Sequence, residues 1–117
     1  MTGELPEALG ACGRLEALRL SGCRLEGAIP ARLAACGRLE LLALDGNRLT
    51  GEVPAELGAR CGALRVARLA RNQLGGRVPR AFGAALRVLD LAGNAFDDAA
   101  EAKDELRRAL PDCAVSL

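Results

Sequence analysis

Four prolines recur along the chain at an almost constant interval. Pro6, Pro30, Pro54 and Pro79 are separated by 24, 24 and 25 residues. The residues between them recur as well, since LEALRLSGCRLEGAIP at 15–30 aligns with LELLALDGNRLTGEVP at 39–54. Neither a helical heptad nor an array of hairpins produces this period, whereas stacked structural units of about 20–45 residues do. The period therefore predicts a repeat architecture.

The whole chain of 117 residues is expected to form one domain, because its length is near the commonest domain size. It divides into a partial repeat at 3–14, four repeats at 15–38, 39–63, 64–85 and 86–96, and a C-terminal segment at 97–117.

The repeats share the pattern L-x-L, in which leucines alternate with positions that face solvent, although Ala67 replaces the first of these leucines in the repeat 64–85. Alternation of this kind is typical of a short strand, so Leu18 with Leu20 and Leu42 with Leu44 should point inward. Successive strands would stack about 4.8 Å apart as a parallel sheet.

A column of polar residues follows the strands, at the point where the chain turns inward. It consists of Cys23, Asn47, Asn72 and Asn94. Because an amide side chain offers both a donor and acceptors, the three asparagines are predicted to form a ladder that satisfies buried backbone groups.

The 24-residue unit L-x-x-L-x-L-x-x-N-x-L-x-G-x-I/V-P-x-x-L resembles the leucine-rich repeat, in its plant-specific subclass, over residues 3–96. The resemblance implies an α/β fold, a right-handed solenoid or horseshoe arc with short parallel strands on its concave face. It also implies a non-catalytic module that binds a protein or peptide on that face. The alternative is a structural C-terminal segment of a larger receptor or scaffold of this family, with little binding of its own.

The two ends of the repeat array differ. At the C-terminal end, the pair Asp98 and Glu101 predicts a capping box before a helix, and alternating apolar residues after Pro111 predict a last strand. This helix and strand would close the solenoid. At the N-terminal end no such cap is evident, so the chain is either a piece of a longer solenoid or a partner, such as a second copy, covers Leu5, Leu9 and Leu15.

Solenoids of stacked repeats commonly bind through the exposed positions of the concave sheet. Those positions are Ala17, Arg19, Ser21, Leu41, Ala43, Asp45, Val66, Arg68, Ala70, Val88, Asp90 and Ala92. The candidate binding residues are Arg19, Leu41, Asp45, Val66, Arg68, Arg71, Val88 and Asp90. The column Ala17, Leu41, Val66 and Val88 is apolar, which indicates either a contact surface or simply the preference of strands for such residues.

Charge is distributed unevenly, because residues 58–96 carry seven arginines and a single acidic residue, Asp90. Arg65, Arg68, Arg71 and Arg87 would lie together and bind an acidic peptide or protein segment, or they are an ordinary solvated face. A nucleic acid partner is not expected, since the net charge is only +1 and the two aromatic residues are Phe82 and Phe96.

The composition argues against catalysis, since the chain contains no histidine. The chain is thus not expected to be an enzyme, and no cofactor or metal is expected. Cys12, Cys36 and Cys61 recur at equivalent places and supply three zinc ligands where four are wanted. They are expected to be a column of buried thiols, with a disulfide between repeats as the alternative.

Targeting signals are scarce. No signal peptide, no run of 18 apolar residues and no Asn-x-Ser/Thr sequon is present, and the cysteine count is five, which is odd. Membrane insertion is not expected. These features favour a reducing compartment such as the cytoplasm, whereas a fragment of a receptor would be extracellular.

Overall fold

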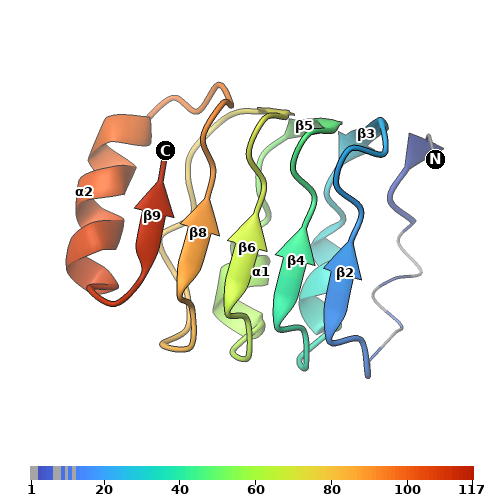
Figure 1. The fold of residues 1–117 in the computed structure, drawn as a ribbon, viewed down its shortest axis with the longest axis horizontal. Coiled ribbons are helices and arrows are strands. Elements are labelled where there is room, and N and C mark those ends of the chain that lie inside the picture. Colours follow the sequence, from blue (N-terminus) through green and yellow to red (C-terminus); the bar gives the residue numbers. More distant parts are fainter. Residues whose placement is uncertain (1–2, 7–8, 10, 12) are drawn as a thin grey trace.

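The computed structural model describes residues 3–6, 9, 11 and 13–117. In it the chain winds into a solenoid whose successive coils each add one short strand to a parallel sheet (Figure 1). The strands of this sheet, in order, are β2 (Ala17–Arg19), β4 (Leu41–Ala43), β6 (Val66–Arg68), β8 (Val88–Asp90) and β9 (Ala114–Ser116). The predicted solenoid with its parallel sheet is confirmed.

Equivalent residues of neighbouring coils lie side by side in this sheet. Ala17 pairs with Leu41, Leu41 with Val66, and Val66 with Val88. The last strand continues the same register, since Ala114 pairs with Val88. The four residues Ala17, Leu41, Val66 and Val88 therefore form one continuous row across the sheet, called the apolar row below.

A second parallel sheet, which the sequence did not predict, lies where the coils turn from the first sheet, and its strands β3 and β5 are labelled along the top of Figure 1. Its strands, in order, are β1 (Gly3–Glu4), β3 (Leu25–Ala28), β5 (Arg48–Gly51) and β7 (Gln73–Leu74). The strands β3, β5 and β7 each begin just after a member of the polar column, where the chain has turned away from the first sheet.

The return paths of the coils are not alike. The first full coil returns through the 3₁₀ helix η2 (Ala31–Ala35) and the second through the short helix α1 (Ala55–Arg60). The third coil is shorter and crosses residues 77–83 without a helix. Among the described residues, no helix has the length and apolarity needed to cross a membrane.

The core is a stack of leucines supplied by every coil. Leu42 and Leu44 of β4 and its exit are fully buried, and their equivalents Leu69, Leu89 and Leu91 are only 1% exposed. Full burial of such a side chain contributes about 1.5–3 kcal/mol. Leu18 and Leu20, in the first full coil, point the same way but are only half-buried because fewer neighbours cover them.

The asparagine column links each coil to the one before it. Asn47 Oδ1 accepts the backbone N–H groups of Cys23 at 2.9 Å and Leu25 at 3.0 Å. Its Nδ2 donates to the carbonyls of Leu20 and Leu44, both at 2.9 Å. Equivalent bonds are made by the two later asparagines of the column. Each amide thus replaces the water that the inward turn excludes.

The C-terminal end is closed by helix α2 (Ala99–Ala109) and strand β9, as the sequence predicts. The helix packs on β9 and buries Ala102 and Leu106 in the core. The predicted capping box is wrong, because Asp98 makes no side-chain bond to the helix backbone.

Asp98 instead joins the third coil to the cap. Its Oδ1 accepts the backbone N–H of Val78 at 3.0 Å, and its Oδ2 contacts the guanidinium of Arg80 and lies 3.7 Å from Arg77 Nε. Arg80 Nε also donates to Glu105 on α2 at 3.0 Å. The side chain therefore satisfies groups 18–20 residues away in preference to its own helix.

These bonds predict a pH-dependent contribution to stability. The hydrogen bond from Arg80, followed by that from the Val78 backbone, holds the pKa of Asp98 below its usual value. A carboxyl with a lowered folded pKa stabilises the native state above its unfolded pKa, near pH 4, and loses this effect as the pH falls through the folded pKa. Asp98→Asn should therefore be less stable than wild type at pH 7, and the difference should shrink below about pH 4.

Urea unfolding from pH 7 to pH 2.5 measures this difference. Asp104→Asn is the matched control, since Asp104 lies exposed on α2. A difference between Asp98→Asn and wild type that stayed constant across the pH range would contradict the prediction.

Candidate functional site

A groove of about 580 Å³ is hollowed in the face of the first sheet, over β2, β4 and β6. It is lined by Arg19, Ser21, Glu40, Leu41, Ala43, Asp45, Arg65, Val66, Arg68 and Arg87. Because parallel strands in register hold these residues, their spacing is fixed by the backbone.

The floor of the groove is aliphatic. Leu41 and Val66, from the middle of the apolar row, are half-buried and line it side by side. Two positions that the alternation predicts to be exposed, Ala43 and Ala70, are only 8% and 3% exposed. Their methyl groups are too short to rise above the longer side chains around them.

Side chains of both charges line the groove. The second full coil contributes the acids Glu40 and Asp45, and the third contributes Arg65 and Arg68. Asp45 is engaged within the chain, where it accepts the hydroxyl of Ser21 at 2.7 Å.

Five of the predicted binding residues meet in this groove, namely Arg19, Leu41, Asp45, Val66 and Arg68. Val88 and Asp90 lie on the next strand, in register with Val66 and Arg68, but outside the groove. The groove also contains Glu40, which the sequence did not single out. Its place directly before a predicted strand, beside the basic Arg65 of the next repeat, is the signal that could have identified it.

Arg71, the remaining predicted residue, lies at the exit of its strand. Its side chain is 74% exposed, and its Nη2 lies 3.4 Å from Asp45 Oδ2 at the rim of the groove. Its backbone has φ +54°, in the left-handed region. The equivalent positions of three other coils hold Gly22, Gly46 and Gly93, with φ between +65° and +71°. Only the third of these four coils thus places a side chain where glycine is the unstrained choice.

Replacing Arg71 with glycine should raise the free energy of unfolding by about 1 kcal/mol, because the left-handed backbone costs a non-glycine residue about that much. The lost contact with Asp45 offsets little, since exposed ion pairs are weak. The midpoint of urea unfolding measures the effect. Arg68→Gly is the control and should lower stability, because Arg68 sits in strand β6. A fall in stability for both variants would refute the strain argument.

Two arginines of the basic segment 58–96 do not line the groove. Arg77 and Arg80 lie on the return path and pair with Asp98 of the cap. From this segment Arg65, Arg68 and Arg87 line the groove, together with Arg19 from the first full coil.

The buried thiols of Cys36 and Cys61 directly follow the return helices η2 and α1. Cys61 is 1% exposed and its Sγ donates to the carbonyl of Cys36 at 3.7 Å, while Cys36 Sγ donates to the carbonyl of Leu9 at 3.2 Å. Burial raises the pKa of the Cys61 thiol, and the neighbouring Cys36 raises it further. Cys12, the first member of the predicted column, lies outside the described residues. In the described part of the chain, no cluster of three or more His, Cys, Asp or Glu side chains could hold a metal ion.

Comparison with known families agrees with the geometry. The model of the family described as Leucine Rich Repeat matches residues 14–36 and 38–59. The chain is a leucine-rich-repeat solenoid. No curated protein matches it in sequence.

Several solved structures are similar to most of the chain. The ectodomain of the plant membrane receptor kinase GASSHO1/SCHENGEN3 from Arabidopsis thaliana, in complex with CASPARIAN STRIP INTEGRITY FACTOR 2, is 38% identical over 81% of this chain, with a TM-score of 0.77. The plant peptide hormone receptor RGFR1, in complex with RGF2, is 31% identical over 81%, with a TM-score of 0.79. A plant ice-binding protein is 30% identical over 82%, with a TM-score of 0.76. This leucine-rich-repeat chain spans only 12%, 15% and 31% of those three chains.

Proposed function

We propose that this chain is a non-catalytic module that binds a protein or peptide segment in the groove of its concave sheet. The observation that carries the proposal is the groove itself, where a half-buried aliphatic floor meets arginines on a sheet of fixed spacing. An interface of this kind gains affinity from the apolar floor and selects its partner by charge. The two receptors above, solved in complex with CASPARIAN STRIP INTEGRITY FACTOR 2 and RGF2, support the choice of a protein or peptide.

Acidic groups on the partner would contact Arg65 and Arg68. Both side chains are exposed, and within the described residues neither makes an ion pair. A guanidinium free of internal partners can form a two-point contact with a carboxylate. The groove also touches all three strands of its floor, so a bound segment would lie across the coils rather than along one of them.

Selection of peptides from a displayed random library against the folded chain tests this function. We expect enriched peptides to bind saturably, and Arg65→Glu/Arg68→Glu to weaken them at least tenfold, since repulsion replaces attraction at two sites. The control is Arg48→Glu/Arg60→Glu, which changes net charge equally at two exposed arginines away from the groove. If both variants lost peptide affinity equally, or if neither lost any, the peptides would bind outside the groove.

A further inference from the structure

Four charged residues lie at the N-terminal ends of the strands of the first sheet, one before each strand from β2 to β8. The residues that directly precede β2, β4, β6 and β8 are Glu16, Glu40, Arg65 and Arg87. They are called the charged row below. Along the solenoid, the row therefore reads acid, acid, base, base.

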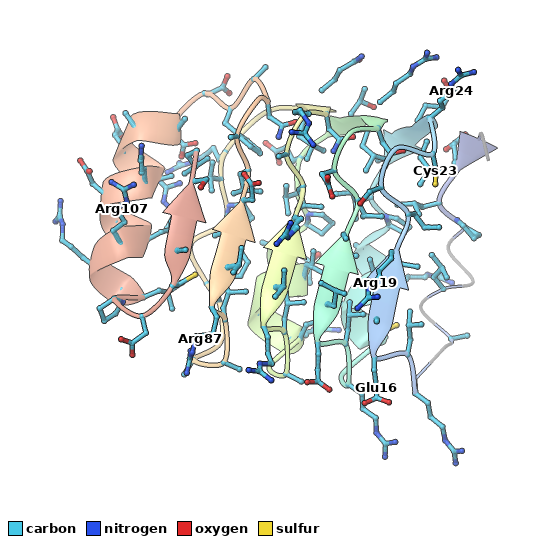
Figure 2. All side chains as sticks on the ribbon, viewed as in Figure 1. Glu16, Arg19, Cys23, Arg24, Arg87 and Arg107 are labelled. Carbon is cyan, nitrogen blue, oxygen red and sulfur yellow. The ribbon has the colours of Figure 1, made fainter. Side chains whose placement is uncertain are left out.

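Backbone hydrogen bonds hold the members of the charged row in register. The N–H of Glu40 donates to the carbonyl of Glu16 at 2.7 Å, and that of Arg65 to Glu40 at 2.8 Å. The N–H of Arg87 donates to the carbonyl of Arg65 at 2.7 Å. Figure 2 shows Glu16 below β2 and Arg87 below β8, at the same edge of the sheet. The positions of the charges are thus set by the strands.

The four charged side chains have no ion-pair partner among the described residues. Arg87 donates only to the carbonyls of Ala84 and Leu86, which leaves its positive charge uncompensated. Three members of the row line the groove, and the row runs directly beside the apolar row.

We propose that the groove binds an extended protein segment whose own charges are ordered to match. This inference rests on the proposed binding function and adds the chemistry of the partner. A basic side chain of the segment contacts Glu16 and Glu40, an acidic side chain contacts Arg65 and Arg87, and an aliphatic side chain between them rests on Leu41 and Val66.

The spacing sets how far apart the two charges of the segment lie. The centre of the Glu16 and Glu40 pair lies two strands from the centre of the Arg65 and Arg87 pair, and the outermost charges lie three strands apart. For a strand separation of about 4.8 Å these distances are about 10 Å and about 14 Å. An extended chain advances about 3.3 Å per residue, so the basic and acidic residues of the segment are about three to four positions apart. The reverse order would place like charges together at both ends of the segment.

The library described above also tests this inference, because enriched peptides reveal their charge order. We expect a basic and an acidic residue about three to four positions apart, in one consistent order, with an aliphatic residue between them. Exchanging these two charges within a selected peptide should weaken its binding to the wild-type chain about tenfold, since exposed ion pairs are individually weak. The preference for one charge order over the other should become smaller as salt is added, because salt screens exposed charges.

Reversing the charged row should reverse the preferred order, whichever way the peptide runs. The variant is Glu16→Arg/Glu40→Arg/Arg65→Glu/Arg87→Glu, which keeps the net charge. Its matched control is Glu26→Arg/Arg48→Glu, an exposed pair in register on the second sheet, which should leave the order unchanged. If the fourfold variant does not fold, Glu40→Gln/Arg65→Gln should abolish most of the preference.

Peptides enriched with both charge orders, or an order that survives these changes, would overturn the inference while leaving the binding function intact. A library that gave no enriched peptide would overturn the binding function, and the inference with it.

Discussion

Replacing Asn47 with alanine is expected to lower the free energy of unfolding by about 3–4 kcal/mol, because each buried backbone group left without a partner costs about 1–3 kcal/mol. The amide serves two N–H groups and two carbonyls, and it is itself only 8% exposed. Water that enters the loosened turn offsets part of the loss. Urea unfolding measures this change. If the free energy of unfolding depends on urea concentration with the same slope in both proteins, the loss appears as a lower midpoint.

The control lies in the same column. Cys23 occupies the corresponding place in the preceding coil, but its thiol makes only a 3.5 Å contact with the carbonyl of Ser21. Cys23→Ala should therefore cost less than about 1 kcal/mol, as weak thiol contacts contribute little. Equal losses for the two variants would mean that the Asn47 amide is not what joins these coils.

Replacing Gly58 with alanine is expected to destabilise the chain by about 2–3 kcal/mol through overpacking. Alanine favours an isolated helix by about 1 kcal/mol over glycine, so propensity alone predicts the opposite sign for this position in α1. Packing decides, because a Cβ on Gly58 would lie 2.0 Å from the carbonyl oxygen of Ala81 and 2.8 Å from Phe82 Cδ1. The return path of the third coil would have to move.

Gly62→Ala is the matched control for this prediction. It lies just after the same helix, and a Cβ there meets no heavy atom within 4 Å. Its effect on the urea midpoint should be within about 0.5 kcal/mol of wild type, as for other open surface sites. If Gly58→Ala were as stable as Gly62→Ala, the close approach of the third coil to α1 would be refuted.

The sequence predicted the concave sheet well because its signal is repeated. Leu42 and Leu44 alternate with residues on the opposite face of the sheet, and the same alternation returns in the other coils, so an exception in one copy is outweighed by the others. The second sheet gave no such signal. Strands such as Leu25–Ala28 and Arg48–Gly51 contain a glycine and a single leucine each, so they show no alternating pair of leucines by which a strand could be recognised.

The sequence did not predict the features that depend on residues far apart along the chain. Asp98 followed by Glu101 has the local pattern of a capping box, but Val78 and Arg80 are held nearby by the previous coil and compete for the carboxylate. The lining of the groove could be anticipated only in part for the same reason. Alternation along the strands indicates that Leu41 and Val66 face outward, but it gives no sign that Val88 and Asp90 lie outside the groove or that Glu40, directly before β4, lines it.

The hydrogen bonds between coils have a consequence for how fast the chain folds. Asn47 reaches back 24 residues to Cys23, Leu49 reaches forward 23 residues to Asn72, and Asn72 reaches 22 residues to Asn94. Because the entropy lost on closing a loop depends on its length, each of these steps costs nearly the same. Folding is therefore expected to begin with one pair of coils and to spread like a zipper. The folding time should be set by that first pair, and adding further coils should change it little.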